Sequence, residues 1–459
     1  MGVYDDINYR TAGCYRMAKT AYRLNCSFII FILKRFAQFH IAMLKYSLFF
    51  LLNFALYTRT TAQPVLETGG KKMPAEWIDK DTHHRVIKLS ATMQGNSLSF
   101  YFHNNPFIGN DMFFYNSSKQ KAEAVTDMKR EAPLSSNVNN KQLYSIDLAT
   151  KKVKQITDQL LPMNGEIVSE KTKTIFYQVN DSVFSFDLTA KKNKLIFVFP
   201  EDFKAGITSV NADGSLLAGS RATDAEKEIL KNHPNKSEFF NLIFEAKLPK
   251  TLFTIDIKTG RLEKIFTDSA WLNHVQFSSV NPNLLMFCHE GPWHKLNRLW
   301  TIDVVTKKIT QIHHRTIENE IWGHEWFGKS GKTIWFDLQQ PKGQTFFVGG
   351  YDVATGREMK YSLQRNEWSV HYNSNATETL FAGDGGDPGA VAKAPDGQWI
   401  YLFTPDGEKF KSEKLVSMKH HQYKLEPNVH FSPDGKWIIF RANFEGEANV
   451  YAVEIRRNE

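Results

Sequence analysis

The stretch HVQFSSVNPNLLMFCHEGPWHKLNRLWTID, residues 274–303, decides the fold. It contains two apolar strands separated by the turn-rich segment SSVNPN. His274 starts the first strand, and His289 lies just past the apolar run of the second. A reverse turn between antiparallel neighbours brings the start of the first strand beside the end of the second. We therefore expect His274 and His289 at the same edge of a sheet, with Glu290 and Trp293 close by.

Turns of the same two kinds recur along the chain. One kind precedes an apolar strand, in MQGNSL at 93, SEKTKTI at 169, NADGSLLAG at 211, SVNPNLLMF at 279, GKSGKTIWF at 328, NATETLFAG at 375 and SPDGKWIIF at 432. The other follows a strand that ends in Asp, in IDLATKKV at 146, FDLTAKKN at 186, IDIKTGRL at 255, IDVVTKKI at 302 and YDVATGRE at 351. Two alternating hairpin turns at intervals of roughly 40 to 70 residues are typical of a β-propeller.

We predict an all-β fold over residues 84–459, a seven-bladed β-propeller with four antiparallel strands per blade. A pair of β-sandwiches is the alternative, which the regular alternation of turns disfavours. The strand HRVIKLS at 84–90 is expected to close the ring, with NVYAVEI as the last strand. Insertions are expected at 104–140 and at 222–248, and the second, which is charged, should hold the only helix. Residues 63–83, with GGKK, are interpreted as a polar linker.

The N-terminus has the plan of a secretory signal peptide at residues 43–62, with a short basic start, an apolar run and small residues before Gln63. We interpret residues 1–42 as a spurious extension upstream of the biological start. The alternative is a membrane anchor built from the apolar runs, but each is well under the roughly 20 residues that a spanning helix needs. The prediction is a periplasmic or secreted protein without stable membrane insertion after cleavage.

Composition is that of an ordinary globular protein, with 42% hydrophobic and 23% charged residues and a net charge of +8 over 459 residues. No block of Lys and Arg indicates nucleic-acid binding. Cys14 and Cys26 precede the predicted cleavage site, which leaves Cys288 alone in the mature chain and excludes an intramolecular disulfide. Since Cys288 lies in the apolar run LLMFC, a buried structural thiol is favoured over a nucleophile.

In a propeller, first-strand starts and second-strand ends share one face. This arrangement places several histidines on that face, namely His103, His274, His289, His324, His371 and the run Gln422 to His430. Neutral imidazoles act as general bases or metal ligands. A base suits proton abstraction beside a carboxylate, provided that cations or a metal ion neutralise the carboxylate. Mn²⁺ or Ca²⁺ accepts mixed His and oxygen ligands. The sequence has no HExxH, CxxC, P-loop or GxSxG pattern.

The strings LNHVQF, LLMFCHEGPWHKLNRLWTID, GHEWF with GKTIWFD, HYN with LFAGDGGD, and LEPNVHFSPDGKWIIFRAN resemble the oligogalacturonate lyases. The resemblance covers roughly residues 84–455 and is strongest from 250 onward; FCHEGPWH is its most specific part. It implies a seven-bladed propeller that cleaves short oligogalacturonides by β-elimination. In that family a histidine takes the C5 proton, an arginine helps to neutralise the uronate, and histidines with a glutamine bind Mn²⁺.

Carried over residue by residue, the resemblance assigns the catalytic base to His274 and one metal ligand to His324. His289 and Glu290 match the substrate-face motif. The chain departs from the family in its last blade, where EPN (Glu426, Pro427 and Asn428) replaces a paired-histidine HPH motif. The glutamine ligand has no clean counterpart, Gln422 being the nearest, and the family's arginine is replaced by Lys250 or Thr251.

The resulting prediction is a lyase acting on an acidic oligosaccharide, with His274 as base. The predicted metal ligands for Mn²⁺ or Ca²⁺ are His324, Glu426, Asn428 and Gln422. The predicted cation is Lys250, with Arg221 as a further candidate. The substrate site is predicted to include His289, Glu290, Trp293, His371 and Trp326. The loss of the HPH pair and of the arginine leaves two alternatives open, a non-catalytic propeller that binds a saccharide or a protein, and a lyase for another uronate.

Overall fold

The computed structural model describes residue 43, residues 63–117 and residues 141–457. The chain divides into two compact units, residues 1–63 and residues 64–459, and every described strand lies in the second. The predicted N-terminal extension and all but Met43 of the predicted signal peptide fall outside the described residues. Among the described residues, no helix has the length and apolar character needed to cross a membrane.

Three consecutive sheets are four-stranded antiparallel meanders. The first consists of β9 (Met163–Ser169), β10 (Thr174–Val179), β11 (Ser182–Asp187) and β12 (Lys192–Val198). The second consists of β13 (Gly206–Val210), β14 (Leu216–Arg221), β15 (Lys250–Asp256) and β16 (Leu262–Asp268). The third consists of β17 (Trp271–Phe277), β18 (Leu284–Glu290), β19 (Leu299–Asp303) and β20 (Ile309–Gln311). The predicted hairpin at 274–290 is thereby confirmed as β17 and β18.

Two larger sheets extend the pattern. The sheet before the meanders consists of β4 (Asn96–Leu98), β5 (Phe107–Ile108), β6 (Asp111–Ser117), β7 (Gln142–Asp147) and β8 (Val153–Gln155). The eight-stranded sheet after them joins two meanders. The first consists of β21 (Ile321–Phe327), β22 (Thr333–Gln339), β23 (Phe346–Asp352) and β24 (Glu358–Leu363). The second consists of β25 (Tyr372–Ser374), β26 (Phe381–Gly383), β27 (Trp399–Asp406) and β28 (Lys409–Ser417). A single parallel bridge, Ser362 to Lys409, connects the two meanders.

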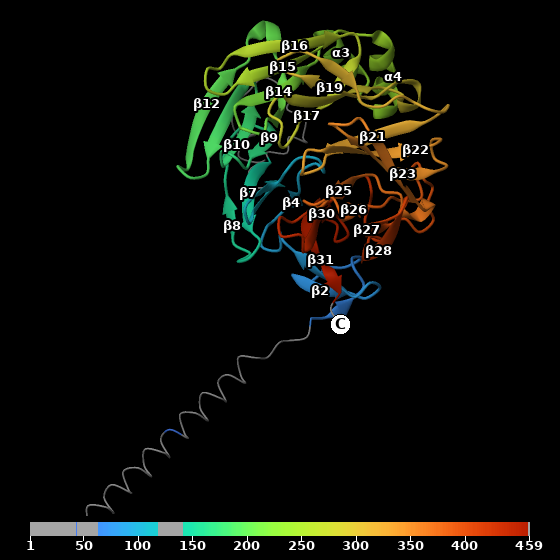
Figure 1. The fold of residues 1–459 in the computed structure, drawn as a ribbon. Coiled ribbons are helices and arrows are strands. Elements are labelled where there is room, and N and C mark those ends of the chain that lie inside the picture. Colours follow the sequence, from blue (N-terminus) through green and yellow to red (C-terminus); the bar gives the residue numbers. More distant parts are fainter. Residues whose placement is uncertain (1–42, 44–62, 118–140, 458–459) are drawn as a thin grey trace, which may run out of the picture. The chain divides into compact units, whose positions relative to one another are not determined.

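The last sheet unites the two ends of the unit. It consists of β1 (Val65–Leu66), β2 (Glu76–Asp79), β3 (His84–Lys88), β29 (His430–Phe431), β30 (Trp437–Ala442) and β31 (Asn449–Arg457). Strand β3 pairs antiparallel with β31, which confirms the predicted closure by the strand at 84–90. The sheets follow one another around the unit, from teal and green through yellow to orange and red (Figure 1). The all-β prediction is confirmed.

The interpretation of residues 63–83 as a linker is wrong. Strands β1 and β2 lie within this segment and extend the last sheet. Trp77 is fully buried, and its Nε1 donates to Thr68 Oγ1 at 2.9 Å, while Thr68 donates to Asp79 Oδ2 at 2.6 Å. The segment is polar in composition, but its polar side chains bond to one another around a buried tryptophan.

The recurring turn after Asp has a specific bonding pattern. Asp147 Oδ1 accepts the backbone N–H groups of Ala149 and Thr150 at 3.1 and 2.7 Å. Equivalent bonds occur at Asp187, Asp256, Asp303 and Asp352. Each of these residues ends the third strand of its meander, so the repeat is an Asx turn that reverses the chain into the fourth strand.

The core lies between adjacent sheets because the second strands are buried on both faces. All of β22, TIWFDLQ, is buried, and Leu285, Met286, Phe287 and Cys288 of β18 are fully inaccessible. The burial of Cys288 confirms the prediction of a structural thiol, and burial raises the pKa of that thiol well above its usual value. Apolar strands with no polar face are typical of sheets covered on both sides.

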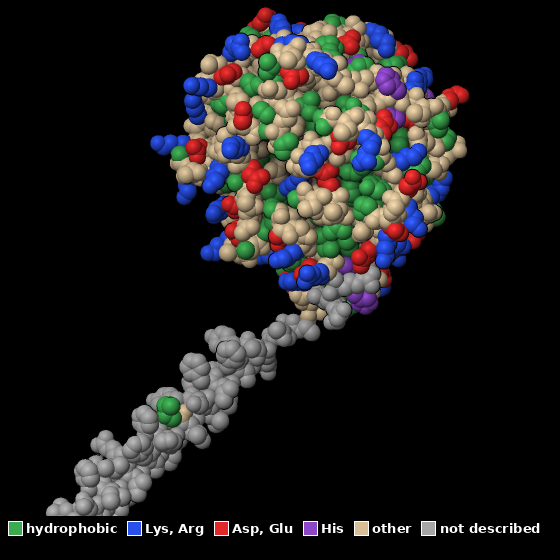
Figure 2. All heavy atoms as spheres, in the orientation of Figure 1, with side chains coloured by type: hydrophobic (Ala, Val, Ile, Leu, Met, Phe, Trp, Pro, Cys, Tyr) green, Lys and Arg blue, Asp and Glu red, His purple; other side chains and the backbone are tan. Residues whose placement is uncertain are grey.

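The insertion at 222–248 is confirmed, but it holds two helices, α3 (Asp224–Asn232) and α4 (Lys236–Ala246). Thr223 caps α3 by accepting the N–H of Glu226. Short 3-10 turns occur at Glu201–Phe203, Trp293–Lys295 and Arg365–Glu367. Of the other predicted insertion, residues 118–140 are not described. On the face shown in Figure 2, basic and acidic side chains are interspersed.

Candidate functional site

His274 lies at a β-bulge in β17 and is flanked by two carboxylates. Its φ of 49° is left-handed, and the pairing of β17 with β18 shifts register between Asn273 and Gln276. Such a bulge redirects a side chain out of the strand's alternation. His274 Nε2 lies 3.7 Å from Glu290 Oε2. Nδ1 lies 3.3 Å from Glu325 Oε1, without the alignment of a hydrogen bond.

Arg298 joins the two carboxylates that flank His274. Its Nη1 donates to Glu290 Oε1 at 2.7 Å and its Nε donates to Glu325 Oε2 at 3.2 Å, and all three side chains are buried. The guanidinium lies 4.4 Å from the ring centre of Trp293, whose Nε1 donates to Glu290 at 2.7 Å. Burial alone raises the pKa of Glu290, but Arg298 and His274 lower it, to about 2. Glu290 is therefore ionised.

A second polar group centres on His371. Its Nδ1 is 3.0 Å from Asp384 Oδ2, and both side chains are fully buried. Asp384 also accepts the backbone N–H of His371 at 2.7 Å and that of Asn428 at 3.1 Å. His371 Nε2 lies 3.3 Å from the Tyr101 hydroxyl and 3.8 Å from Glu426 Oε2.

The two groups meet in one histidine cluster. The rings of His324 and His371 are 4.7 Å apart between centroids, and the rings of His103 and His274 are 6.0 Å apart. Tyr101 lies between them, 5.1 Å from His371 and 5.0 Å from His103. The structure thus brings together the predicted residues His274, His324 and His371. Burial lowers the pKa of His103 and of His324 well below the usual value, so both imidazoles are neutral.

Several predicted substrate residues lie outside the cluster. His289 precedes Glu290 in β18, so the alternation of the strand turns it to the opposite side, where it stacks on Trp300 at 5.0 Å and lies 3.8 Å from Asp268. Trp326 is buried in the core, with its Nε1 3.3 Å from Ser374. Trp293 does reach the cluster, with its ring 5.1 Å from that of His324.

The two predicted cations have other partners. Lys250 is buried, and its Nζ forms an ion pair of 2.9 Å with Glu226 of α3. Arg221 donates to the carbonyl of Asp202 at 3.1 Å and lies over the ring of Phe203. The inserted helix α3 thus supplies a carboxylate that neutralises Lys250. The prediction that Lys250 neutralises the substrate carboxylate is therefore not supported.

The predicted metal ligands do not form a matching set. Asn428 Oδ1 accepts the N–H of Phe102 at 2.9 Å, and Nδ2 donates to the carbonyl of Glu426 at 2.9 Å. Both side-chain groups of Asn428 are therefore engaged, and Gln422 is exposed. Within the described ranges, no group of three or more His, Cys, Asp or Glu is arranged to hold a metal ion.

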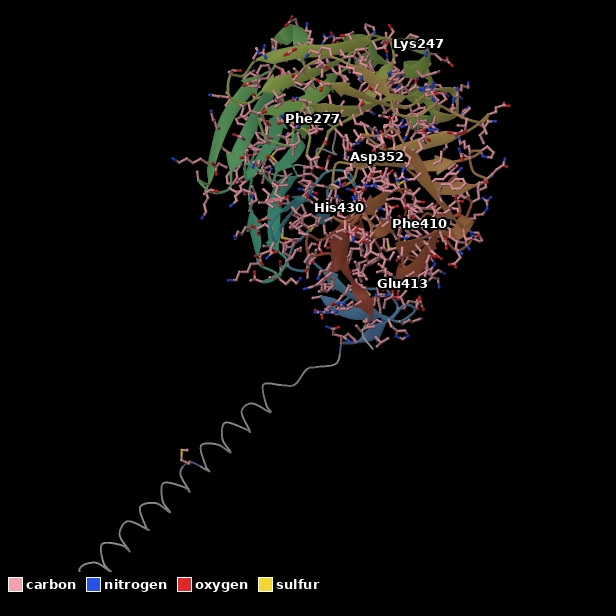
Figure 3. All side chains as sticks on the ribbon, viewed as in Figure 1. Lys247, Phe277, Asp352, Phe410, Glu413 and His430 are labelled. Carbon is pink, nitrogen blue, oxygen red and sulfur yellow. The ribbon has the colours of Figure 1, made fainter. Side chains whose placement is uncertain are left out.

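Two cavities adjoin the cluster. One of ≈ 440 Å³ is lined by residues of four sheets, among them Tyr101, His103, Tyr115, Asn164, Thr208 and His274. The other, of ≈ 480 Å³, includes His103, His430 and Lys329. His430 lies toward the interior of the unit, whereas Lys247 lies toward its rim (Figure 3). The first cavity has the size of a ligand pocket and is bordered by both His274 and Tyr101.

Sequence reasoning missed four residues of this site, namely Tyr101, Arg298, Glu325 and Asp384. Glu325 and Arg298 stand in the quoted strings GHEWF and HKLNRLW, and Asp384 stands in LFAGDGGD. A signal was therefore present for these three, because a buried strand that contains a charged residue requires a partner. Tyr101 carries no such signal, since its neighbours SFYFHN are those of an ordinary strand.

Comparison with known proteins extends these observations. A family model described as oligogalacturonate lyase matches residues 135–458. The chain is 23% identical over 327 residues to the oligogalacturonide lyase of Pectobacterium atrosepticum, a match that covers 68% of this chain and 82% of that protein. It is 24% identical over 333 residues to the oligogalacturonate lyase of Dickeya dadantii, with the same coverage of 68% and 82%.

Solved structures show the same fold. A crystal structure of oligogalacturonate lyase from Vibrio parahaemolyticus superposes with a TM-score of 0.68 at 21% identity, covering 83% of this chain and 96% of that one. An oligogalacturonate lyase in complex with manganese superposes with a TM-score of 0.69 at 20% identity, covering 85% and 99%. Because the family model matches well over half of its residues, the chain belongs to the oligogalacturonate lyase family and is a lyase.

Proposed function

We propose that this lyase cleaves short oligogalacturonides by β-elimination and releases products with a 4,5-unsaturated uronate, with His274 as the general base. The observation that carries the proposal is a buried imidazole between two ionisable carboxylates at the edge of a ≈ 440 Å³ cavity. Burial lowers the pKa of His274, although Glu325 and Glu290 raise it. The imidazole is thus neutral at neutral pH and can accept the C5 proton.

We further propose that Arg441 binds the uronate carboxylate in place of Lys250. Arg441 Nε donates to the carbonyl of Glu426 at 2.7 Å and Nη1 donates to the carbonyl of Ser99 at 3.0 Å. Both acceptors are neutral carbonyls. Burial lowers the pKa of the guanidinium, and the carboxylate of Glu426 is the first charged group that raises it. An arginine is charged at neutral pH and matches the geometry of a carboxylate.

The arrangement of the sheets supports a seven-bladed propeller. The eight-stranded sheet divides into two meanders at its single parallel bridge, and each remaining sheet supplies one meander of four strands. The last blade then takes β3 from the N-terminal end and β29–β31 from the C-terminal end.

Residues 43–62 are proposed as a signal peptide, and the protein is proposed to be periplasmic or secreted. N-terminal sequencing of the mature protein tests this proposal.

One similar structure is a complex with manganese, but here Asn428 is engaged by backbone groups and Gln422 is exposed. Because this donor set does not fit a metal ion, the proposed mechanism has no step through one. The carboxylate is neutralised by Arg441 instead.

The direct test is the ultraviolet absorbance of the unsaturated uronate. The chain from Gln63 is incubated with di- and trigalacturonate, with added Mn²⁺ or with chelator. A rise in both arms supports the proposal, and a rise that chelator abolishes shows that a metal ion takes part. No rise with galacturonides but a rise with another uronate oligomer identifies a different substrate. No rise with any uronate supports the alternative of a non-catalytic binding protein.

Replacement of Glu325 with glutamine is expected to move the acidic limb of the kcat/KM profile to lower pH. The limb reports protonation of His274, and Glu325 raises the pKa of that imidazole. Without the carboxylate the pKa falls further, so the neutral base persists to lower pH while its lower basicity reduces the plateau rate. A profile measured with trigalacturonate checks the shift. An unmoved limb would exclude His274 as the titrating group.

Replacement of Arg441 with glutamine is expected to raise KM for digalacturonate by about 10-fold or more, since a hydrogen bond to a charged group contributes roughly 1.5–3 kcal/mol. The methyl ester of the substrate lacks the charge, so its KM should change much less. Arg261→Gln, at a side chain 73% exposed, is the matched control. An equal rise in KM for acid and ester would contradict direct recognition of the carboxylate.

A further inference from the structure

We propose that Tyr101 is the catalytic acid that protonates the leaving oxygen, positioned by a Tyr101–His371–Asp384 chain. This inference rests on the proposed β-elimination and adds to it the residue that faces the departing sugar. A sugar alkoxide is a poor leaving group, so its departure benefits from a proton donor close to the C4–O4 bond. A base alone, such as His274, leaves that requirement unmet.

The geometry places Tyr101 beside the base. Tyr101 and His274 both line the ≈ 440 Å³ cavity, and their ring centroids are 6.3 Å apart. The proton to be removed is on C5 and the bond to be broken is on the adjacent C4. Because C4 and C5 are neighbours, the donor and the acceptor have to lie close together on the cavity wall, as these two rings do. Tyr101 follows β4 and His274 lies in β17, and these two strands are the first strands of different sheets.

The hydroxyl of Tyr101 is held by a buried dyad. Asp384 Oδ2 lies 3.0 Å from His371 Nδ1, so Nδ1 carries the hydrogen and Nε2 is left as an acceptor. The Tyr101 hydroxyl donates to that Nε2 at 3.3 Å. The dyad orients the hydroxyl through this bond, which breaks when the hydroxyl turns to O4. His371 and Asp384 are positioning residues, since neither lines the cavity.

The Glu-Pro-Asn segment that replaces the expected histidine pair serves this chain of groups. The backbone N–H of Asn428 donates to Asp384 Oδ2 at 3.1 Å, and its Oδ1 accepts the N–H of Phe102 at 2.9 Å. Asn428 therefore fixes the dyad on one side and the strand segment carrying Tyr101 on the other. Phe102 stacks on His371 at 4.6 Å and completes the packing. These contacts give the altered segment a role in positioning the acid.

The proposed step balances in atoms and electrons. His274 takes the C5 proton, the C–H electron pair forms the C4–C5 double bond, and the C4–O4 bond breaks. The Tyr101 hydroxyl turns from His371 to O4 and donates its proton there, so the leaving sugar departs as an alcohol. After product release the proton on His274 returns to the Tyr101 oxygen through solvent. Burial raises the pKa of Tyr101, which keeps the phenol protonated before the reaction.

The test compares two leaving groups with Tyr101→Phe, which removes only the hydroxyl. The first substrate is digalacturonate, and the second is a galacturonate with a 4-O-(4-nitrophenyl) group, which departs as a stable anion without a proton. The variant is expected to lose about 10²- to 10⁴-fold in kcat on digalacturonate and to stay close to the wild type on the nitrophenyl substrate. Tyr177→Phe is the matched control, because that hydroxyl bonds Asn193 away from the cluster.

Each outcome separates the two proposals. A loss confined to digalacturonate supports Tyr101 as the acid. An equal loss on both substrates, or no loss on either, overturns the role of Tyr101 as the acid. The proposed β-elimination still stands in that case, because the wild-type protein forms the unsaturated product. If the wild-type protein forms no unsaturated product from either substrate, the proposed function fails and the role of Tyr101 fails with it. His274→Gln should lose activity on both substrates, which distinguishes a base from an acid.

Discussion

Replacement of His274 with glutamine is expected to lower kcat/KM for digalacturonate by about 10²- to 10⁴-fold, the usual contribution of a general base. Glutamine retains a polar side chain but cannot accept the C5 proton. The imidazole makes no aligned hydrogen bond through Nδ1, and it borders a cavity, so its removal leaves the surrounding strands in place. The rate is measured by the absorbance of the unsaturated product.

His420→Gln provides the control for this experiment. His420 is a partly exposed histidine that pairs with Glu67 at 3.1 Å, away from the cluster. The His420→Gln variant should leave kcat/KM near the wild-type value. Both His274→Gln and His420→Gln should unfold at the wild-type temperature. A rate for His274→Gln that matches the control would require another base.

Replacement of Arg298 with methionine is expected to reduce the free energy of unfolding by about 3–5 kcal/mol. Arg298 is fully buried and bonds both Glu290 and Glu325. Without the guanidinium, two buried carboxylates face each other across His274 with no permanent counter-charge. Denaturant unfolding near neutral pH measures the change.

The effect of the uncompensated charges on the stability of Arg298→Met can be distinguished from the effect of lost packing. A triple variant that also carries Glu290→Gln and Glu325→Gln should recover part of the stability, because neutral amides replace the uncompensated charges. Acidification should likewise reduce the penalty of Arg298→Met, since the unpaired carboxylates then protonate. Arg261→Met, at an exposed arginine, is the control. An Arg298→Met protein as stable as the control would contradict a structural ion-pair network.

The strand pattern could be predicted from the sequence because its causes are local. Asp followed three residues later by Thr and then by Lys or Gly forms the same Asx turn at Asp147, Asp256 and Asp303. Apolar runs between such turns must be buried, which fixes an all-β fold. The hairpin itself was also predicted, but His274 lies in the middle of β17 (Trp271–Phe277) and not at its start.

The sequence was less informative where a short segment is polar yet buried. Residues 63–83 lack a long apolar run, so the strands around Trp77 were not predicted. Lys250 stands at the strand start expected for a cation, but the inserted α3 brings Glu226 to it. His289 was placed at the correct edge, and the alternation of β18 turned it away from the site in favour of Glu290.

The sequence by itself determined the strands, the turns and the histidines at one edge of the sheets. Only the tertiary structure decided which of these side chains meet. Tyr101 and His371 are 270 residues apart in the chain, and their contact depends on the packing of different sheets. Bulges at His274 and His324 redirect single side chains. Turn formation depends on residues that are neighbours in the sequence. A catalytic arrangement depends on strand register and on packing between sheets that are far apart in the chain.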